Sequence, residues 1–155
     1  MKVEESFVVP QPRDALWAFV QDVERVAWCL PGVESVEVVG PDDLDLIVAQ
    51  RLGPFSAAFE TKLHIDERDE GRRIAFTAVG RSVRGASGNL RAVNAVSLED
   101  ADGGGTRVLI DADVALGGVL GAVGQKVVAK QAAKVTRTFA ENLERAVAEG
   151  PGGAA

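Results

Sequence analysis

The feature that most constrains the fold is a long amphipathic stretch near the C-terminal end of the chain. From Val119 to Ala148 the sequence contains no proline and, after Gly124, no glycine. At the helical period of 3.6 residues per turn, apolar side chains gather on the side centred on Val135. We therefore predict a single helix over this stretch, whose apolar face must pack against the rest of the chain.

Two glycines in the first turns of this predicted helix need an explanation. Gly121 and Gly124 fall on its inward face, and glycine weakens a helix by about 1 kcal/mol relative to alanine. Either the sheet approaches closely at these positions, or they leave space for a ligand and a mobile entrance.

The residues before this helix have the patterns of strands and two short helices. Period-two alternation predicts seven strands, at Lys2–Val9, Val33–Val39, Leu44–Leu52, Phe55–Asp66, Arg72–Gly80, Arg84–Glu99 and Thr106–Leu116. Short helices are expected at Arg13–Gln21 and Val23–Trp28, with Asp22 placed to cap the second. Short turns between successive strands favour antiparallel neighbours. The predicted architecture is an α+β fold, in which the long helix closes a curved antiparallel sheet.

The composition is that of a single soluble domain. The chain has 155 residues, 46% hydrophobic and 26% charged. Its net charge of −6 argues against a nucleic-acid partner. Cys29 is the only cysteine, which excludes an intramolecular disulfide and a thiol-based metal cluster. No apolar run is long enough for a signal peptide or a membrane span, so we expect a cytoplasmic protein.

No pattern in the sequence indicates catalysis or metal binding. His64, Asp111 and Asp113 alternate with apolar residues and are therefore predicted on the solvent face of their strands. Cys29 has no histidine near it in sequence to act as a base, and its expected role is that of a buried small hydrophobe. Metal-ligand spacing, a phosphate-binding loop and a nucleophile elbow are all missing. We therefore predict no catalytic residue and no metal ligand.

Two amides and four cations distinguish the predicted helix from an ordinary core helix. Gln131 and Asn142 project among its apolar residues, and a buried amide needs a hydrogen-bonding partner. That partner is either a neighbouring backbone group or a ligand carbonyl. The basic residues on the far side and flank are Lys126, Lys130, Lys134 and Arg137. They form a solvated face in the plainer interpretation, and a docking surface for anionic lipid or an acidic partner in the sharper one.

Several local sequences together resemble one known family. The matching segments are Val9-Pro10, Leu16-Trp17-Ala18-Phe19, Asp22-Val23-Glu24-Arg25, Cys29-Leu30-Pro31-Gly32-Val33-Glu34-Ser35-Val36, Gly53-Pro54-Phe55-Ser56-Ala57, Gly104-Gly105-Thr106-Arg107-Val108 and Leu116-Gly117-Gly118. The Cys-Leu-Pro-Gly segment is the most specific of these. Over residues 1–148 the chain resembles the G-subunit family of carbon monoxide dehydrogenase, within the helix-grip superfamily (SRPBCC, START-like, Bet v 1-like).

The resemblance implies a seven-stranded antiparallel sheet wrapped on the long helix, with two short helices after the first strand and a deep apolar cavity. It implies a non-enzymatic accessory protein of a molybdenum-containing carbon monoxide dehydrogenase or a related molybdenum hydroxylase. Such a protein would bind an isoprenoid quinone of the menaquinone or ubiquinone type, or another apolar ligand, with no covalent cofactor. It would also help to recruit the enzyme to the inner face of the cell membrane.

The C-terminal end of the sequence allows two interpretations. Family members often carry a linker and a membrane-binding segment after the domain, and we expect residues 149–155 to be a flexible tail or the start of such a linker. Either the sequence is truncated there or the anchoring role is absent.

The alternative function is a small cyclase or hydrolase acting on an aromatic or lipid-like substrate in the same cavity. That enzyme would need an acid–base pair, which the predicted strand faces place outside.

We expect the cavity to be lined from the short helices, the sheet and the long helix. The predicted lining residues are Trp17, Trp28, Leu30, Phe55, Phe59, Phe76, Leu90, Leu116, Leu120, Val127, Val128, Gln131 and Val135. For the aromatic residues, ordinary core packing is the competing interpretation. Gln131 is the best candidate for a polar contact to a quinone-like head group.

Overall fold

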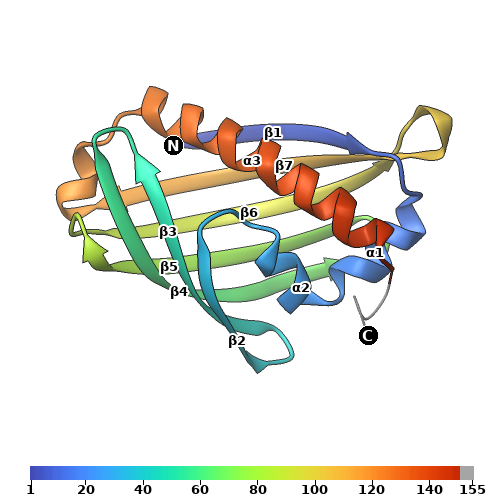
Figure 1. Cartoon of the computed structure of the whole chain (residues 1–155), viewed down its shortest axis with the longest axis horizontal. Coiled ribbons are helices and arrows are strands. Elements are labelled where there is room, and N and C mark those ends of the chain that lie inside the picture. The colour runs from blue at the N-terminus through green and yellow to red at the C-terminus, as the bar shows by residue number, and fades with distance from the viewer. Residues whose placement is uncertain (151–155) are drawn as a thin grey trace.

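The computed structural model describes residues 1–150, and it shows a strongly curved sheet crossed by one long helix (Figure 1). Seven antiparallel strands lie in the order β1-β7-β6-β5-β4-β3-β2. They are β1 (Lys2–Val9), β2 (Val33–Gly40), β3 (Asp43–Leu52), β4 (Phe55–Asp69), β5 (Arg73–Gly85), β6 (Asn89–Asp100) and β7 (Thr106–Gly117). From β2 to β7 each strand pairs with the next in the chain, whereas β1 pairs with β7. The predicted α+β architecture is confirmed.

Two short helices follow β1 and lie at one end of the sheet (Figure 1). They are α1 (Arg13–Val20) and α2 (Val23–Trp28), and both agree with the prediction to within one residue. Asp22 caps α2 as expected, since its carboxylate accepts the backbone N–H of Arg25 at 3.3 Å. The apolar side of α1 is buried, so this end of the sheet is covered.

The long helix begins later than the sequence pattern predicts. Helix α3 covers Gln125–Ala148, and a separate 3-10 turn, η2, covers Gly118–Ala122. The prediction of one helix from Val119 was therefore wrong at its beginning, because the backbone is extended at Val123 and at the N-cap residue Gly124. Neither Gly121 nor Gly124 lies inside α3, so neither glycine has to be accommodated within it.

The turn between β5 and β6 also differs from the prediction. A break was expected after Gly80 and a new strand from Arg84, but β5 continues to Gly85 and β6 begins at Asn89. Gly85 and Gly88 have φ values of +81° and +150°, which favour glycine, so they form the turn. A Cβ at Gly85 would lie 2.2 Å from the carbonyl oxygen of Ser56 in β4. The strand end therefore approaches its neighbour closely.

The buried core is divided into separate clusters along α3. The first cluster, at the N-terminal part of α3, contains Val3, Ala57, Phe59, Ala112, Leu120, Val123 and Val128. The second cluster, between α1 and the C-terminal part of α3, contains Val9, Leu16, Phe19, Cys29, Leu98, Val108 and Leu143. A third, smaller cluster, beside α2, contains Ala27, Leu44 and Leu46. The middle of α3 lies between the first two clusters.

Most of the predicted C-terminal tail, residues 149–155, lies outside the part of the chain that the structure describes. Glu149 is the C-cap residue of α3, and residues 151–155 lie outside the described range. None of the helices within residues 1–150 combines the length and the apolar character that a transmembrane span requires.

Candidate functional site

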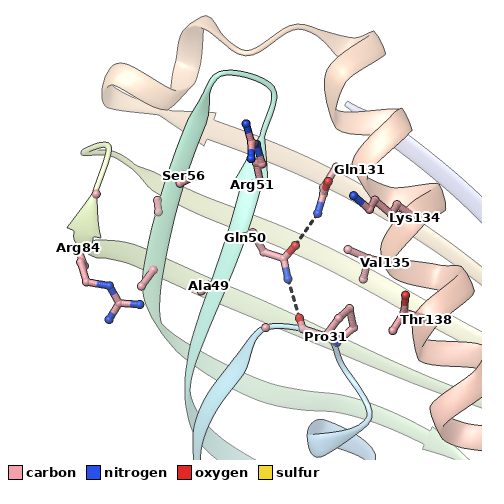
Figure 2. A pocket seen from close by; sticks show the side chains of 14 residues that line it. Pro31, Ala49, Gln50, Arg51, Ser56, Arg84, Gln131, Lys134, Val135 and Thr138 are labelled. Carbon is pink, nitrogen blue, oxygen red and sulfur yellow. Dashed lines mark hydrogen bonds between the residues drawn. The ribbon is translucent and has the colours of Figure 1, made fainter.

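A pocket of about 430 Å3 lies beside the middle of α3 (Figure 2). Its opposite wall comes from the loop before β2 and from β3, β4 and the end of β5. The lining residues are Pro31, Gly32, Ala49, Gln50, Arg51, Ser56, Ala57, Ala58, Arg84, Gly85, Gln131, Lys134, Val135 and Thr138.

The pocket exists because α3 is packed at its two ends and less completely between them. Val128 is buried in the first cluster and Leu143 in the second, whereas Gln131 and Val135 are only partly buried and belong to neither. Phe76, from the middle of β5, is also partly buried and outside the described clusters. Protein interiors are normally close-packed, so this incomplete packing leaves room for another molecule.

Two glutamine side chains link α3 across the pocket to the loop before β2. Gln131 Nε2 donates to Gln50 Oε1 at 2.9 Å, and Gln50 Nε2 donates to the carbonyl oxygen of Pro31 at 2.9 Å (Figure 2). A carbonyl can only accept, so Pro31 orients Gln50, and Gln50 in turn orients Gln131. Each NH2 group uses one of its two hydrogens in these bonds. The second hydrogen of each amide is left to donate to water or a ligand.

Gly32 holds the same loop against β3. Its φ of +86° is one that favours glycine. A Cβ at this position would lie 2.0 Å from the carbonyl oxygen of Ala49. The Gly32 carbonyl oxygen accepts the backbone N–H of Ala49 at 2.8 Å. Only glycine allows this close approach, which places the Pro31 carbonyl within reach of Gln50.

The charged residues that line the pocket are all basic: Arg51, Arg84 and Lys134. Arg84 is paired with Glu34 at 2.5 Å, and this hydrogen bond raises the pKa of the guanidinium. Arg51 and Lys134 are exposed and form no ion pair with any residue in the described part of the chain. No histidine, cysteine, aspartate or glutamate from residues 1–150 lines the pocket, so an acid–base pair is not found there.

The family follows from the sequence of the domain as a whole. Residues 6–148 match the family described as the carbon monoxide dehydrogenase G subunit (CoxG). This chain belongs to the CoxG family. The resemblance inferred from the Cys29–Gly32 segment and its companions is therefore confirmed. No curated protein matches this CoxG-family chain.

Solved structures share the fold of this CoxG-family protein at low sequence identity. A conserved protein from Geobacillus kaustophilus has a TM-score of 0.85 at 15% identity, with 96% of each chain covered. A START superfamily protein from Mycobacterium smegmatis has a TM-score of 0.70 at 18% identity, covering 96% of this chain and 97% of that chain. The Zhui aromatase/cyclase from Streptomyces sp. R1128 has a TM-score of 0.65 at 15% identity, with 99% of each chain covered. These likenesses show a START-like helix-grip fold and leave the ligand undefined.

The residues predicted to line a cavity are distributed over several environments in this CoxG-family fold. Gln131 and Val135 line the pocket. Trp17 packs against the second cluster, and Trp28 is 51% exposed at the end of α2. Leu30 and Phe76 are partly buried. The predicted residues that belong to the first cluster or pack against it are Phe55, Phe59, Leu90, Leu116, Leu120, Val127 and Val128. Contact of any of these residues with a ligand stays a prediction.

Most of the pocket was not identified from the sequence. Gln50, Arg51 and Ser56 belong to β3 and β4, and the sequence of these strands does not indicate that α3 lies across the pocket from them. Gln50 carried a signal, because it is the polar residue in the alternation Leu44, Leu46, Val48, Gln50, Leu52. Gln131 was expected to bond a backbone group or a ligand, and its partner is instead the Gln50 side chain.

Asn142, the other amide predicted to point inward, bonds a backbone group, which was one of the two partners expected for it. Asn142 Nδ2 donates to the carbonyl oxygen of Cys29 at 2.9 Å. Cys29 itself is buried as predicted, and burial raises the pKa of its thiol against the opposing charges of Arg25 and Arg145. A buried thiol with a raised pKa is a poor nucleophile.

The remaining candidate residues lie on the surface. His64 is exposed, and the hydrogen bond between its Nδ1 and Asp43 Oδ1 at 2.8 Å raises its pKa. Asp113 pairs with the terminal amine of Met1 at 3.2 Å, which lowers the pKa of that carboxyl. Within residues 1–150, no three histidine, cysteine or acidic side chains are grouped so that they could hold a metal ion. The four predicted docking residues, Lys126, Lys130, Lys134 and Arg137, are all exposed, and Lys134 also lines the pocket.

Proposed function

We propose that this chain is a non-enzymatic binding protein for an apolar ligand. The observation that carries the proposal is the pocket beside α3, which lies where the core is interrupted. Its volume of about 430 Å3 falls within the roughly 300–1,000 Å3 that small-molecule sites occupy. Small and apolar side chains, such as Ala57, Ala58 and Val135, form part of the wall, and a few polar groups supply direction.

The ligand that best fits the family is an isoprenoid quinone. A quinone carbonyl would accept one of the spare N–H groups of Gln131 or Gln50, with its ring beside Val135. The isoprenoid tail would lie against the small apolar side chains of the wall, such as Ala57 and Ala58. Burial of ligand carbon would supply about 25 cal/mol per Å2 of affinity before the costs of association. Electron transfer would then belong to the quinone and to a partner enzyme, and no side chain of the pocket would be needed for it.

Binding is favoured over catalysis by the side chains that face the pocket. A cyclase or hydrolase acting on an aromatic substrate would need a proton donor and acceptor within reach of the reacting atoms. His64, Asp111 and Asp113 are exposed on strands, and none of them lines the pocket. The cyclase alternative therefore serves as one outcome of the test.

The test is to extract the purified protein, taken from a quinone-containing host, and to identify the released lipids by mass spectrometry. Val135→Trp fills the pocket from α3, and Ala129→Trp places the same side chain on an exposed position of α3 as a control. We expect near-stoichiometric quinone in the native protein and in Ala129→Trp, and little in Val135→Trp. An empty native protein that also fails to take up added menaquinone would contradict the proposal. Conversion of an added aromatic substrate would favour the enzyme.

Association with a molybdenum hydroxylase is the second part of the proposal. It rests on membership of the CoxG family, and co-purification with the molybdenum-containing enzyme tests it. The exposed residues Lys126, Lys130, Lys134 and Arg137 offer a basic surface on an acidic protein for contact with that enzyme or with anionic lipid at the inner face of the cell membrane. The triple variant Lys126→Glu, Lys130→Glu, Arg137→Glu should lose binding to anionic liposomes or to the partner. Unchanged binding of both would leave this surface as a solvated face.

A further inference from the structure

The charge around the pocket is opposite in sign to the charge of the protein. The net charge is −6, yet all three charged residues of the lining are basic. Glu34 neutralises Arg84, and the two cations without an ion-pair partner among the described residues are Arg51 and Lys134. They come from β3 and α3, on opposite sides of the pocket, and both are among its lining residues (Figure 2).

The uncharged polar groups of the lining add to this preference. Gln131 donates one amide hydrogen to Gln50 and Gln50 donates one to the Pro31 carbonyl, so each keeps a second amide hydrogen, and Ser56 and Thr138 supply hydroxyl groups. These groups can all donate hydrogen bonds, and no lining carboxylate competes for them or repels an anion. Hydrogen bonds to a charged oxygen are stronger than those to a neutral carbonyl. A ligand with negatively charged oxygens would therefore use more of this lining than a neutral ligand would.

We infer that the pocket binds the anionic head group, a carboxylate or a phosphate monoester, of an amphiphile whose chain lies along Val135. The inference rests on the apolar-ligand binding proposed above and adds the class of head group, independently of whether a quinone also binds. Arg51 and Lys134 set the preference for the anion. The hydrogen-bonded side chains of Gln50 and Gln131, the glutamine pair, orient it.

The test compares three ligands that share one chain and differ in head group: dodecanoate, dodecyl phosphate and the neutral 1-dodecanol. Affinities are measured by titration calorimetry below the micelle concentration, at low and high salt. The variant Arg51→Gln, Lys134→Gln removes both free cations of the pocket. The variant Arg91→Gln, Arg107→Gln removes the same charge from exposed positions that are not part of the lining, so it controls for net charge.

We expect the anionic ligands to bind on the order of tenfold more tightly than dodecanol, with the difference shrinking as salt rises. The Arg51→Gln, Lys134→Gln variant should lose that difference and keep its affinity for dodecanol, whereas the Arg91→Gln, Arg107→Gln control should keep both. The better of the two anionic ligands shows whether the pocket prefers a carboxylate or a phosphate head group.

Equal affinities for all three ligands in the native protein would overturn the anion preference and leave apolar-ligand binding standing. An equal loss in the pocket variant and the control would assign the effect to overall charge and would also overturn it. Failure of all three ligands to bind would overturn this inference, and uptake of added menaquinone by the same protein would show that the proposed function still stands.

Discussion

Two consecutive segments of α3 have the same helical pattern and face different surroundings. The closed segment, Phe139–Ala146, packs against α1 and β1, with Leu143 only 2% exposed and the rings of Phe7 and Phe139 edge to face at 6.2 Å. The pocket segment, Gln131–Thr138, faces Gln50 of β3 and the loop before β2. An amphipathic helix thus indicates that one face is covered, and it does not indicate whether the cover is dry core or a binding pocket.

The two inward amides of the helix illustrate the same difference. In the closed segment, Asn142 is used for structure, because it donates to the backbone of Cys29 at the end of α2. In the pocket segment, Gln131 bonds another side chain that itself has a spare donor. One amide ties two helices together, and the other forms part of an adaptable polar wall.

The two segments should differ most in the free energy of unfolding that is lost when one apolar side chain of each is shortened. Leu143→Ala leaves a cavity in close-packed core and should lower the free energy of unfolding by about 3 kcal/mol. Val135→Ala removes fewer contacts beside an existing space and should cost about 1 kcal/mol or less. Urea denaturation of both variants gives the comparison. Equal losses would mean that the pocket segment is packed as tightly as the closed one.

A second comparison tests how the loop of the pocket is held. Gly32→Ala places a methyl group against the Ala49 carbonyl, and should cost about 2 kcal/mol or more from strain and displacement of the loop. Gly71→Ala is the matched control, since Gly71 also has a positive φ of +74° but has open space around its Cβ position. The control should cost about 1 kcal/mol. Thermal unfolding measures both, and an equal effect would show that close approach to β3 is unimportant.

The two amides should differ by a smaller amount. Asn142→Ala leaves the Cys29 carbonyl without its donor in a partly buried site and should cost about 1 kcal/mol. Gln131→Ala lies at a pocket that water can enter and should cost less than about 0.5 kcal/mol. Chemical denaturation again gives both values. A larger loss for Gln131→Ala would make the glutamine pair a structural tie and weaken its assignment to ligand binding.

The last comparison concerns the accessibility of two thiols to a reagent in solution. Native Cys29 lies in the second cluster, and burial raises its pKa. It should therefore react slowly with a disulfide reagent at neutral pH. In the variant Cys29→Ala, Val135→Cys, the single thiol lines the pocket and should react at least about tenfold faster. Similar rates in the two proteins would show that the pocket is closed in solution.

The sequence predicts much of the fold because its signals are local. His64 was predicted on the solvent face of its strand and is exposed, whereas its neighbours Thr61 and Ile65 in β4 are buried. The errors arose where a helical or strand pattern ran through glycines without a proline to interrupt it, at Gly124 and at Gly85. There the backbone geometry ended the element while the side-chain pattern continued.

The site is less predictable because it depends on contacts between distant segments. Gln50 and Gln131 meet across the pocket, and the Pro31 carbonyl that orients them comes from a third segment. Local periodicity can mark Gln50 and Gln131 as inward polar residues, but their partnership depends on how α3 lies over β3. The free charge of Arg51 and Lys134 could not be inferred either, since exposed cations usually pair or are solvated.

The pairing of β1 with β7 has a consequence for how the molecule assembles. From β2 to β7 every strand pairs with its chain neighbour, so these contacts form by closing short loops, whereas Lys2 lies opposite Asp113. Helix α3 is the last element of the domain and packs against β1, the first. On the ribosome, the sheet can therefore be nearly complete while one wall of the pocket is still being synthesised. A ligand of this pocket could bind only after α3 has emerged, so it could not guide the earlier pairing of β2 to β7.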